Sequence, residues 1–341
     1  PALIEVGRPF LLLIGWSIVP TILQIVWKDY SEALSRPWLP FWIMMVGVLV
    51  NVVLAWALIF GRLGLPEMGL TGAGLATLIA RVVAAAGLVL AIACGKEYRP
   101  YRVARIAGSR CRKQVGTLFK LGWPTGLHLL SEVGLFCLAS LMMGWIGVGA
   151  LAAHQVAITC ASTAFMVPLG LALAVTVRVG QSVGAREYHR VRPIAFGALG
   201  LGAVVMLLCG MVFVFKGNLI ANTFFPGEPD TAALLVSLLM VAAGFGIFDA
   251  TQIVCMGGLR GLADVRVPMI YVYIAYWLVA LPVAYYFGFH TRLQGVGIWT
   301  GLLTGLVLVS VAVGSRLWRM SRVSEIEKRY PRAARQSEFA V

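Results

Sequence analysis

The chain has 341 residues, of which 60% are hydrophobic and 12% are charged, and its formal net charge is +14. A water-soluble domain carries about twice this charged fraction. The apolar residues form blocks of about twenty residues, which is the length of a helix that crosses a bilayer. This composition excludes an ordinary soluble protein. The six cysteines form no CxxC pair and have no metal-ligand spacing, so no disulfide framework and no metal site of that kind is expected.

Nine apolar blocks are predicted to cross the membrane as helices. In chain order, spans 1 to 9 cover residues 9–27, 38–60, 69–94, 117–145, 152–177, 194–216, 232–256, 268–288 and 295–318. The connections between them are short, and most contain Gly, Pro or basic residues. The predicted fold class is therefore an all-α, polytopic integral membrane protein.

The basic residues predict the orientation of the spans, because Lys and Arg accumulate in cytoplasmic loops. If the connection after span 1 is cytoplasmic, 23 of the 28 basic residues lie on the cytoplasmic side, together with the C-terminus. Only Arg8, Arg62, Lys216 and Arg292 lie on the opposite side. The net charge thus reflects membrane topology, and the expected partner is the lipid bilayer of a bacterial inner membrane rather than a nucleic acid.

The sequence also contains a weak internal repeat. A shift of 228 residues places Gln24-Ile-Val on Gln252-Ile-Val and Pro40 on Pro268, and a small gap aligns the Gly-rich start of span 3 with that of span 9. Spans 1–3 are therefore interpreted as the counterpart of spans 7–9, and duplicated halves are typical of secondary transporters. The repeat predicts about 110 further residues and three helices before Pro1, which gives two lobes of six helices.

This interpretation predicts four segments. Residues 1–95 form the C-terminal half of an N-lobe, residues 96–116 form a basic cytoplasmic loop, residues 117–318 form a six-helix C-lobe, and residues 319–341 form a charged cytoplasmic tail with little helix. Because half of the N-lobe is expected to be missing, this segment of the protein is not expected to transport alone.

Three charged residues lie deep within predicted spans: Glu132 in span 4, Asp249 in span 7 and Arg81 in span 3. A charge at the bilayer centre costs about 3 kcal/mol or more, so it persists only with a partner, a water-filled cavity or a function. Each carboxylate could be a protonated acid that links helices. We favour a functional role, in which Glu132 and Asp249 exchange a proton or bind a small cation. Arg81 is expected to be structural, or else a charge in the cavity.

Two neighbouring side chains could assist these carboxylates. His128 lies one helical turn before Glu132 and could accept its proton, although an interfacial histidine with only structural contacts is an open alternative. Gln252 lies three residues after Asp249 and could offer its amide oxygen to a hard cation such as Na⁺. We therefore predict a cation and substrate site formed by Glu132, Asp249, Gln252 and His128, with Na⁺ or H⁺ as coupling ion and no cofactor.

Several stretches, in this order, resemble the multidrug and toxic compound extrusion (MATE) transporters, and in particular their NorM-like branch. The first stretch is residues 37–61, which contain the sequence Val-Asn-Val-Val-Leu. The others are Gly69-Leu-Thr-Gly-Ala-Gly, Leu121-Gly-Trp-Pro-Thr-Gly, Ser131-Glu-Val-Gly-Leu-Phe, Ala152-Ala-His-Gln, Arg178-Val-Gly-Gln-Ser and Gly257-Gly-Leu-Arg-Gly. The similarity extends from Pro1 to about Arg322.

The resemblance implies twelve helices in two lobes around a central cavity, of which family helices 4 to 12 are present here. It also implies export of organic cations in exchange for Na⁺ or H⁺, by a monomer. Glu132 matches a glutamate of the seventh family helix, and Asp249 matches an aspartate of the tenth. His128 is not expected at its position in the family, so it could alter the preference for the coupling ion.

The sequence disfavours three other functions. A lipid-linked oligosaccharide flippase of a related fold would line its cavity with several arginines, and only Arg81 is a candidate here. A membrane enzyme would need clustered His/Asp or Cys/His residues, whereas the four histidines lie in separate segments. A channel is disfavoured because duplicated lobes are typical of alternating access.

Overall fold

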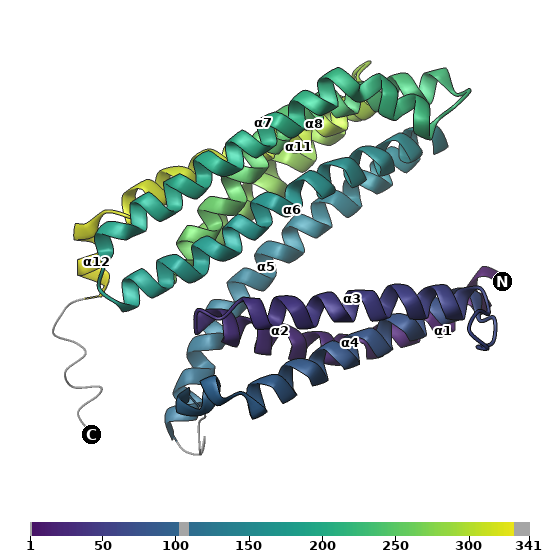
Figure 1. Cartoon of the computed structure of the whole chain (residues 1–341). Helices are drawn as coiled ribbons and strands as arrows, with labels where there is room; N and C mark the ends of the chain where they lie inside the picture. The colour runs from purple at the N-terminus through teal and green to yellow at the C-terminus, as the bar shows by residue number, and fades with distance from the viewer. Residues whose placement is uncertain (1, 102–108, 331–341) are drawn as a thin grey trace. The chain divides into compact units, whose positions relative to one another are not determined.

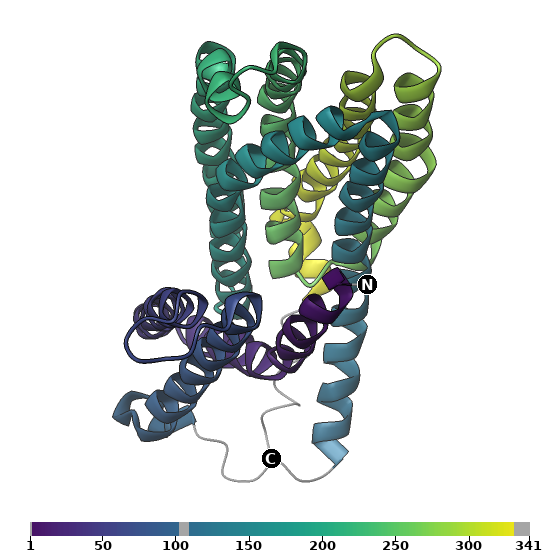
Figure 2. The ribbon, with the colours of Figure 1, turned by 90° about the vertical axis from the view of Figure 1, so that its right-hand side faces the viewer.

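The computed structural model describes residues 2–101 and 109–330, which are almost entirely helical (Figures 1 and 2). The α-helices are α1 (Ala2–Trp16), α2 (Ile18–Ala33), α3 (Trp38–Ile59), α4 (Gly69–Cys94), α5 (Ser109–Ile146), α6 (Val148–Gly184), α7 (Val191–Phe224), α8 (Pro229–Gly261), α9 (Arg266–Tyr273), α10 (Leu281–Phe289), α11 (Gln294–Met320) and α12 (Val323–Arg329). Within the described ranges, 9 segments are long and apolar enough to cross a membrane. The prediction of a polytopic all-α fold with nine spans is confirmed.

The helices extend beyond the apolar blocks that predicted them. The helix α6 has 37 residues and α8 has 33, and α5 begins at Ser109 within the segment expected to be a loop. Hydropathy marks only the part of a helix that lies in hydrocarbon, so it gives no signal where the helix continues among polar groups. Span 1 also differs from expectation, because it is interrupted at Ser17 between α1 and α2.

The chain divides into two compact units, Pro1–Ala107 and Gly108–Val341. In the first unit, α4 packs against α1, α2 and α3. The short helix Lys96–Tyr101 also belongs to this unit, and its Tyr98 side chain is buried, with the hydroxyl oxygen 2.6 Å from that of Ser31. The first part of the expected loop is therefore packed against the helices that precede it.

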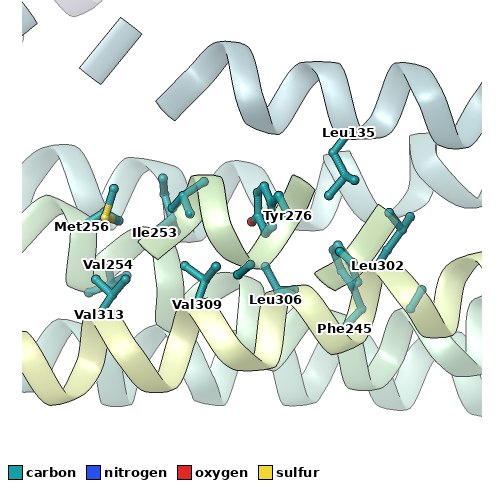
Figure 3. Packing of buried hydrophobic residues seen from close by; sticks show 14 of the residues in the cluster. Leu135, Phe245, Ile253, Val254, Met256, Tyr276, Leu302, Leu306, Val309 and Val313 are labelled. Atoms are coloured by element: carbon teal, nitrogen blue, oxygen red, sulfur yellow. The ribbon is translucent and has the colours of Figure 1, made fainter. Parts of the chain in front are cut away.

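In the second unit, α8 lies between α6, α7 and α11 and contacts all three extensively. Figure 3 shows the apolar packing around α8 and α11, where Val254, Val309 and Val313 belong to one buried cluster. The side chain of Leu306 in the same cluster is also buried. This packing fixes the rotation of α8 about its own axis, and it therefore determines which α8 residues face α5.

The predicted span 8 is an irregular helix. A π-helical segment, Ile274–Ala280, joins α9 to α10 just before Pro282. Proline has no N–H to donate and its ring crowds the preceding turn, and a wider π turn accommodates both effects. Tyr276, within this segment, is buried and faces α8.

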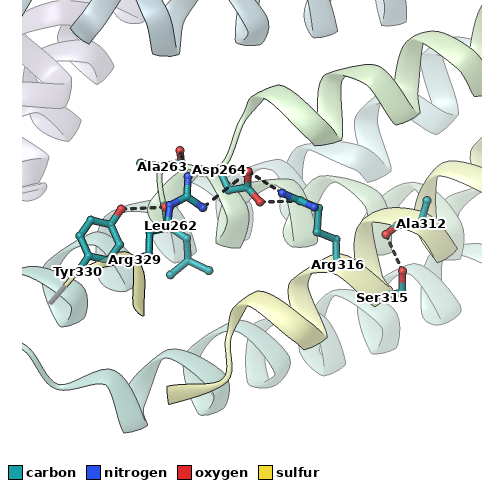
Figure 4. A network of polar contacts seen from close by, with 8 residues as sticks. All are labelled: Leu262, Ala263, Asp264, Ala312, Ser315, Arg316, Arg329 and Tyr330. Atoms are coloured by element: carbon teal, nitrogen blue, oxygen red, sulfur yellow. Dashed lines mark hydrogen bonds and ion pairs between the residues drawn. The ribbon is translucent and has the colours of Figure 1, made fainter. Parts of the chain in front are cut away.

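The expected tail forms more structure than the sequence indicated. The helix α12 packs where α8 joins α9: the guanidinium of Arg329 donates to the carbonyl of Ala263 at 3.0 Å, and the hydroxyl of Tyr330 donates to that of Leu262 at 3.0 Å (Figure 4). Beside them, Arg316 donates to both carboxylate oxygens of Asp264, at 2.6 and 3.1 Å. Residues 319–330 of the expected tail are thus held in place because their side chains satisfy backbone carbonyls at a helix end, whereas residues 331–341 lie outside the described residues.

Two glycines allow close helix packing at matching places in the proposed repeat. A Cβ atom on Gly72 of α4 would lie 2.7 Å from the carbonyl oxygen of Leu58 in α3, and one on Gly297 of α11 would lie 2.3 Å from that of Phe287 in α10. In both cases a glycine-led helix approaches the backbone of the preceding span. The shared contact supports the interpretation of spans 3 and 9 as counterparts.

The Gly297→Ala variant is therefore expected to destabilise the second unit by about 1–3 kcal/mol, because the added methyl group forces α10 and α11 apart. The matched control is Gly314→Ala in the same helix, where a Cβ atom would meet nothing within 4 Å. Thermal unfolding in detergent, followed by circular dichroism, measures both. Equal unfolding temperatures for the two variants would contradict the close approach.

Candidate cation and substrate site

Two helix faces in the second unit carry the predicted site residues. On α5, His128, Glu132 and Phe136 lie four residues apart and share one face. On α8, Phe245 and Asp249 are likewise four residues apart. The two faces meet, since the rings of Phe136 and Phe245 are 6.1 Å apart.

Glu132 and Asp249 line the same cavity, which has a volume of about 300 Å³. Its walls also contain Val133, Phe136, Cys137, Ser140, Ile158, Ala161, Ser162, Phe165, Phe245 and Trp299, from α5, α6, α8 and α11. Apolar and aromatic side chains with a few polar groups are typical of small-molecule sites. Two carboxylates among aromatic rings give this cavity the chemistry to hold a cation, through charge attraction and cation–π contacts.

His128 lies directly behind Glu132. It is 1% exposed, and its Nε2 atom is 4.0 Å from Oε2 of Glu132. Its other ring nitrogen, Nδ1, is 3.3 Å from a guanidinium nitrogen of Arg260. Because Arg260 can only donate, Nδ1 must accept, and a neutral His128 then carries its proton on Nε2, on the side of Glu132.

Gln252 has a different environment from the one expected of a cation ligand. It is fully buried and is not among the residues that line the cavity. Its Oε1 atom accepts a hydrogen bond of 2.8 Å from the hydroxyl of Tyr276. The amide oxygen expected to face a cation thus already has a donor, while Nε2 of Gln252 is buried with no hydrogen-bond partner in the described structure.

A buried hydrogen-bond chain supports the aromatic wall of the cavity. The indole N–H of Trp299 donates to Nδ1 of His154 at 3.0 Å, and Nε2 of His154 is 3.0 Å from the hydroxyl oxygen of Ser140. That hydroxyl lies 3.0 Å from the carbonyl of Phe136, to which it donates. Both ring nitrogens of His154 are therefore engaged, so its role is to orient Trp299 and Ser140.

Arg81 belongs to the first unit. Its guanidinium donates to the hydroxyl of Ser17 at 2.5 Å, at the break between α1 and α2. The structure therefore does not bring Arg81 together with the other predicted site residues within one unit. A hydrogen bond that joins two neighbouring helices is in keeping with the structural alternative.

Arg260, Trp299 and His154 are not among the site residues predicted from the sequence. Arg260 is one of the basic residues that the sequence assigns to the cytoplasmic side, although its spacing of eleven residues from Asp249 places both on one α-helical face. Trp299 and His154 gave no signal of this kind, because their contact joins α6 to α11. Over the described residues, no cluster of three or more His, Cys, Asp or Glu side chains has the arrangement of a metal site.

Comparison with known proteins agrees with this architecture. The family model MatE matches residues 124–286, which include both carboxylates. The probable multidrug resistance protein NorM of Mesorhizobium japonicum is 39% identical over 328 residues, covering 95% of this chain and 70% of the relative. The probable multidrug resistance protein NorM of Bradyrhizobium diazoefficiens is 36% identical over 308 residues, covering 89% of this chain and 66% of the relative.

Solved structures show the same fold at lower sequence identity. A crystal structure of MATE in the bent conformation superposes with a TM-score of 0.80 at 18% identity and covers 96% of this chain and 71% of that one. A eukaryotic MATE transporter superposes with a TM-score of 0.75 at 20% identity and covers 95% of this chain and 79% of that one. From the family match and the NorM relatives together, the chain belongs to the MATE family of multidrug efflux transporters.

Proposed function

We propose that this protein, as a monomer in the bacterial inner membrane with its C-terminus in the cytoplasm, exports organic cations in exchange for Na⁺ or H⁺. The observation that carries the proposal is that Glu132 and Asp249, from two different helices, line one aromatic cavity. The NorM names of the relatives support multidrug export as the purpose of that cavity. Neither a cofactor nor covalent chemistry is needed for such an exchange.

The mechanism follows from competition for two negative charges. An organic cation in the cavity neutralises the carboxylates of Glu132 and Asp249 and packs against Phe136 and Phe165. When Na⁺ or H⁺ binds the same carboxylates, the attraction for the organic cation falls and the drug is released. The ion drives the cycle only through its different affinities for the outward-facing and inward-facing states.

The runner-up function, a lipid-linked oligosaccharide flippase, requires a cavity that attracts pyrophosphate. The residues that line the described cavity include two acids and no base. A carboxylate-lined cavity repels an anionic headgroup, since like charges in a medium of low dielectric constant are strongly unfavourable. The acidic lining therefore favours cation export.

Transport in everted membrane vesicles tests the proposal. Vesicles from cells that express the full-length protein are loaded under an imposed Na⁺ gradient or an imposed pH gradient, each alone, and uptake of ethidium is followed by fluorescence. We expect one of the two gradients to accelerate uptake, and its collapse with an ionophore to abolish the effect. Uptake that depends on neither gradient, or only on ATP, would contradict cation-coupled antiport.

A further inference from the structure

Arg260 is a half-buried arginine at the end of α8 that the proposed mechanism does not use. It has no carboxylate within ion-pair distance in the described part of the chain. Asp264, the acid closest to it in sequence, already binds Arg316 at 2.6 Å and lies 3.8 Å from Arg329. The carboxylate of Asp264 is therefore paired with Arg316, and it does not neutralise the charge of Arg260.

The space around Arg260 is too small for a ligand of its own. Arg260, His128 and Asp264 line a cavity of about 10 Å³. About one water molecule is the most that such a volume holds. An anion such as a phosphate group does not fit in this cavity.

Arg260 contacts His128, which in turn lies next to Glu132. The guanidinium of Arg260 contacts Nδ1 of His128 at 3.3 Å, and Nε2 of the same ring faces Glu132 at 4.0 Å. This buried Nε2 atom has no hydrogen-bond partner among the described residues. The neutral His128 ring thus lies between the guanidinium of Arg260, 3.3 Å from its Nδ1 atom, and the carboxylate of Glu132, 4.0 Å from its Nε2 atom.

We infer that Arg260, held behind His128, is a built-in counter-charge that gives the Glu132–Asp249 site one net negative charge and so makes it selective for monovalent cations. The inference rests on the proposed function, in which these carboxylates bind the transported cation. When both carboxylates are ionised, their two negative charges and the one guanidinium leave a single net negative charge. One monovalent ion or one singly charged drug neutralises the site, whereas a dication leaves it positively charged in a medium of low dielectric constant, which is unfavourable.

Removal of the Arg260 charge should raise the affinity for both kinds of cation, and it should raise the affinity for a dication more than that for a monocation. The electrostatic free energy of a bound ion is its charge times the local potential, so the fold-change for a dication is the square of that for a monocation. In the Arg260→Gln variant we expect tetraphenylphosphonium to bind about fivefold more tightly, which is the effect of one charge that a partly polar medium screens. Methyl viologen should then bind about twenty-five-fold more tightly, because it carries two charges.

The experiment uses the purified protein in lipid nanodiscs, with radiolabelled tetraphenylphosphonium as monocation and methyl viologen as dication. The Arg260→Lys variant keeps the charge and should bind both within about twofold of the unmodified protein, because the potential changes little. The matched control is Arg266→Gln, which removes an exposed charge at the start of α9. It should likewise change neither affinity by more than about twofold, because solvent screens it.

A double variant distinguishes the charge from a loss of fold. Glu132→Gln alone leaves the site neutral and should weaken tetraphenylphosphonium binding, whereas Glu132→Gln with Arg260→Gln restores one negative charge and should recover it. Equal fold-changes for the two ligands in Arg260→Gln, or no recovery in the double variant, would overturn the inference. If the unmodified protein binds neither cation, or Glu132→Gln has no effect, the proposed function itself fails and the inference fails with it.

Discussion

The Glu132→Gln and Asp249→Asn variants of the full-length protein are each expected to reduce ion-driven efflux of organic cations by about a hundredfold. Each substitution keeps the size of the side chain and removes only its charge. Loss of one partner from a desolvated charge pair typically costs 2–5 kcal/mol, and about 2.7 kcal/mol corresponds to a hundredfold change. The effect should be large because both carboxylates line the cavity in which the drug and the ion would compete.

The measurement is ethidium efflux from energised cells, with protein abundance determined in the same membranes. Asp230→Asn is the matched control, because Asp230 is an exposed acid in the first turn of the same helix as Asp249. It should leave efflux within about twofold of the unmodified protein, as expected for a solvated surface charge. Full ion-dependent efflux in both cavity variants would show that the coupling site lies elsewhere.

The second large effect is expected at the junction of α8, α9 and α12. Asp264 is 5% exposed and accepts two hydrogen bonds from Arg316, with Arg329 nearby (Figure 4). The Asp264→Asn variant leaves Arg316 without its counter-ion. Removal of one partner from a buried ion pair typically costs 3–5 kcal/mol, so we expect the free energy of unfolding of the second unit to fall by about 3 kcal/mol.

Unfolding in mixed micelles with increasing sodium dodecyl sulfate, followed by circular dichroism, measures this change. Glu187→Gln is the control, because its ion pair with Arg190 is exposed, with side-chain exposures of 40% and 59%. An exposed pair contributes little, so the control should change the free energy of unfolding by less than about 1 kcal/mol. If the two variants unfolded at the same detergent concentration, the Asp264 network would be a surface feature without structural importance.

The number of spans was predictable from the sequence because hydropathy is a local property. Each helix that crosses a bilayer must satisfy its own backbone hydrogen bonds and present apolar side chains to lipid, so the requirement is met within about twenty contiguous residues. The helix α12 was not predictable in this way, because it depends on polar contacts with another segment: Arg329 donates to the carbonyl of Ala263 just beyond the end of α8. The end of α1 at Trp16 is by contrast a local effect, because Pro20 has no N–H to donate to the carbonyl of Trp16.

For the candidate site, the sequence by itself identified Glu132 and Asp249, since a carboxylate within an apolar span is conspicuous and costly. Only the tertiary structure placed the two in one cavity and Arg260 behind His128. Their proximity depends on how α5 and α8 rotate and pack, which is decided by side chains such as Phe136 and Phe245 that carry no charge signal. A linear pattern records which residues share a helix face, whereas the meeting of two faces more than one hundred residues apart is a property of the packed bundle.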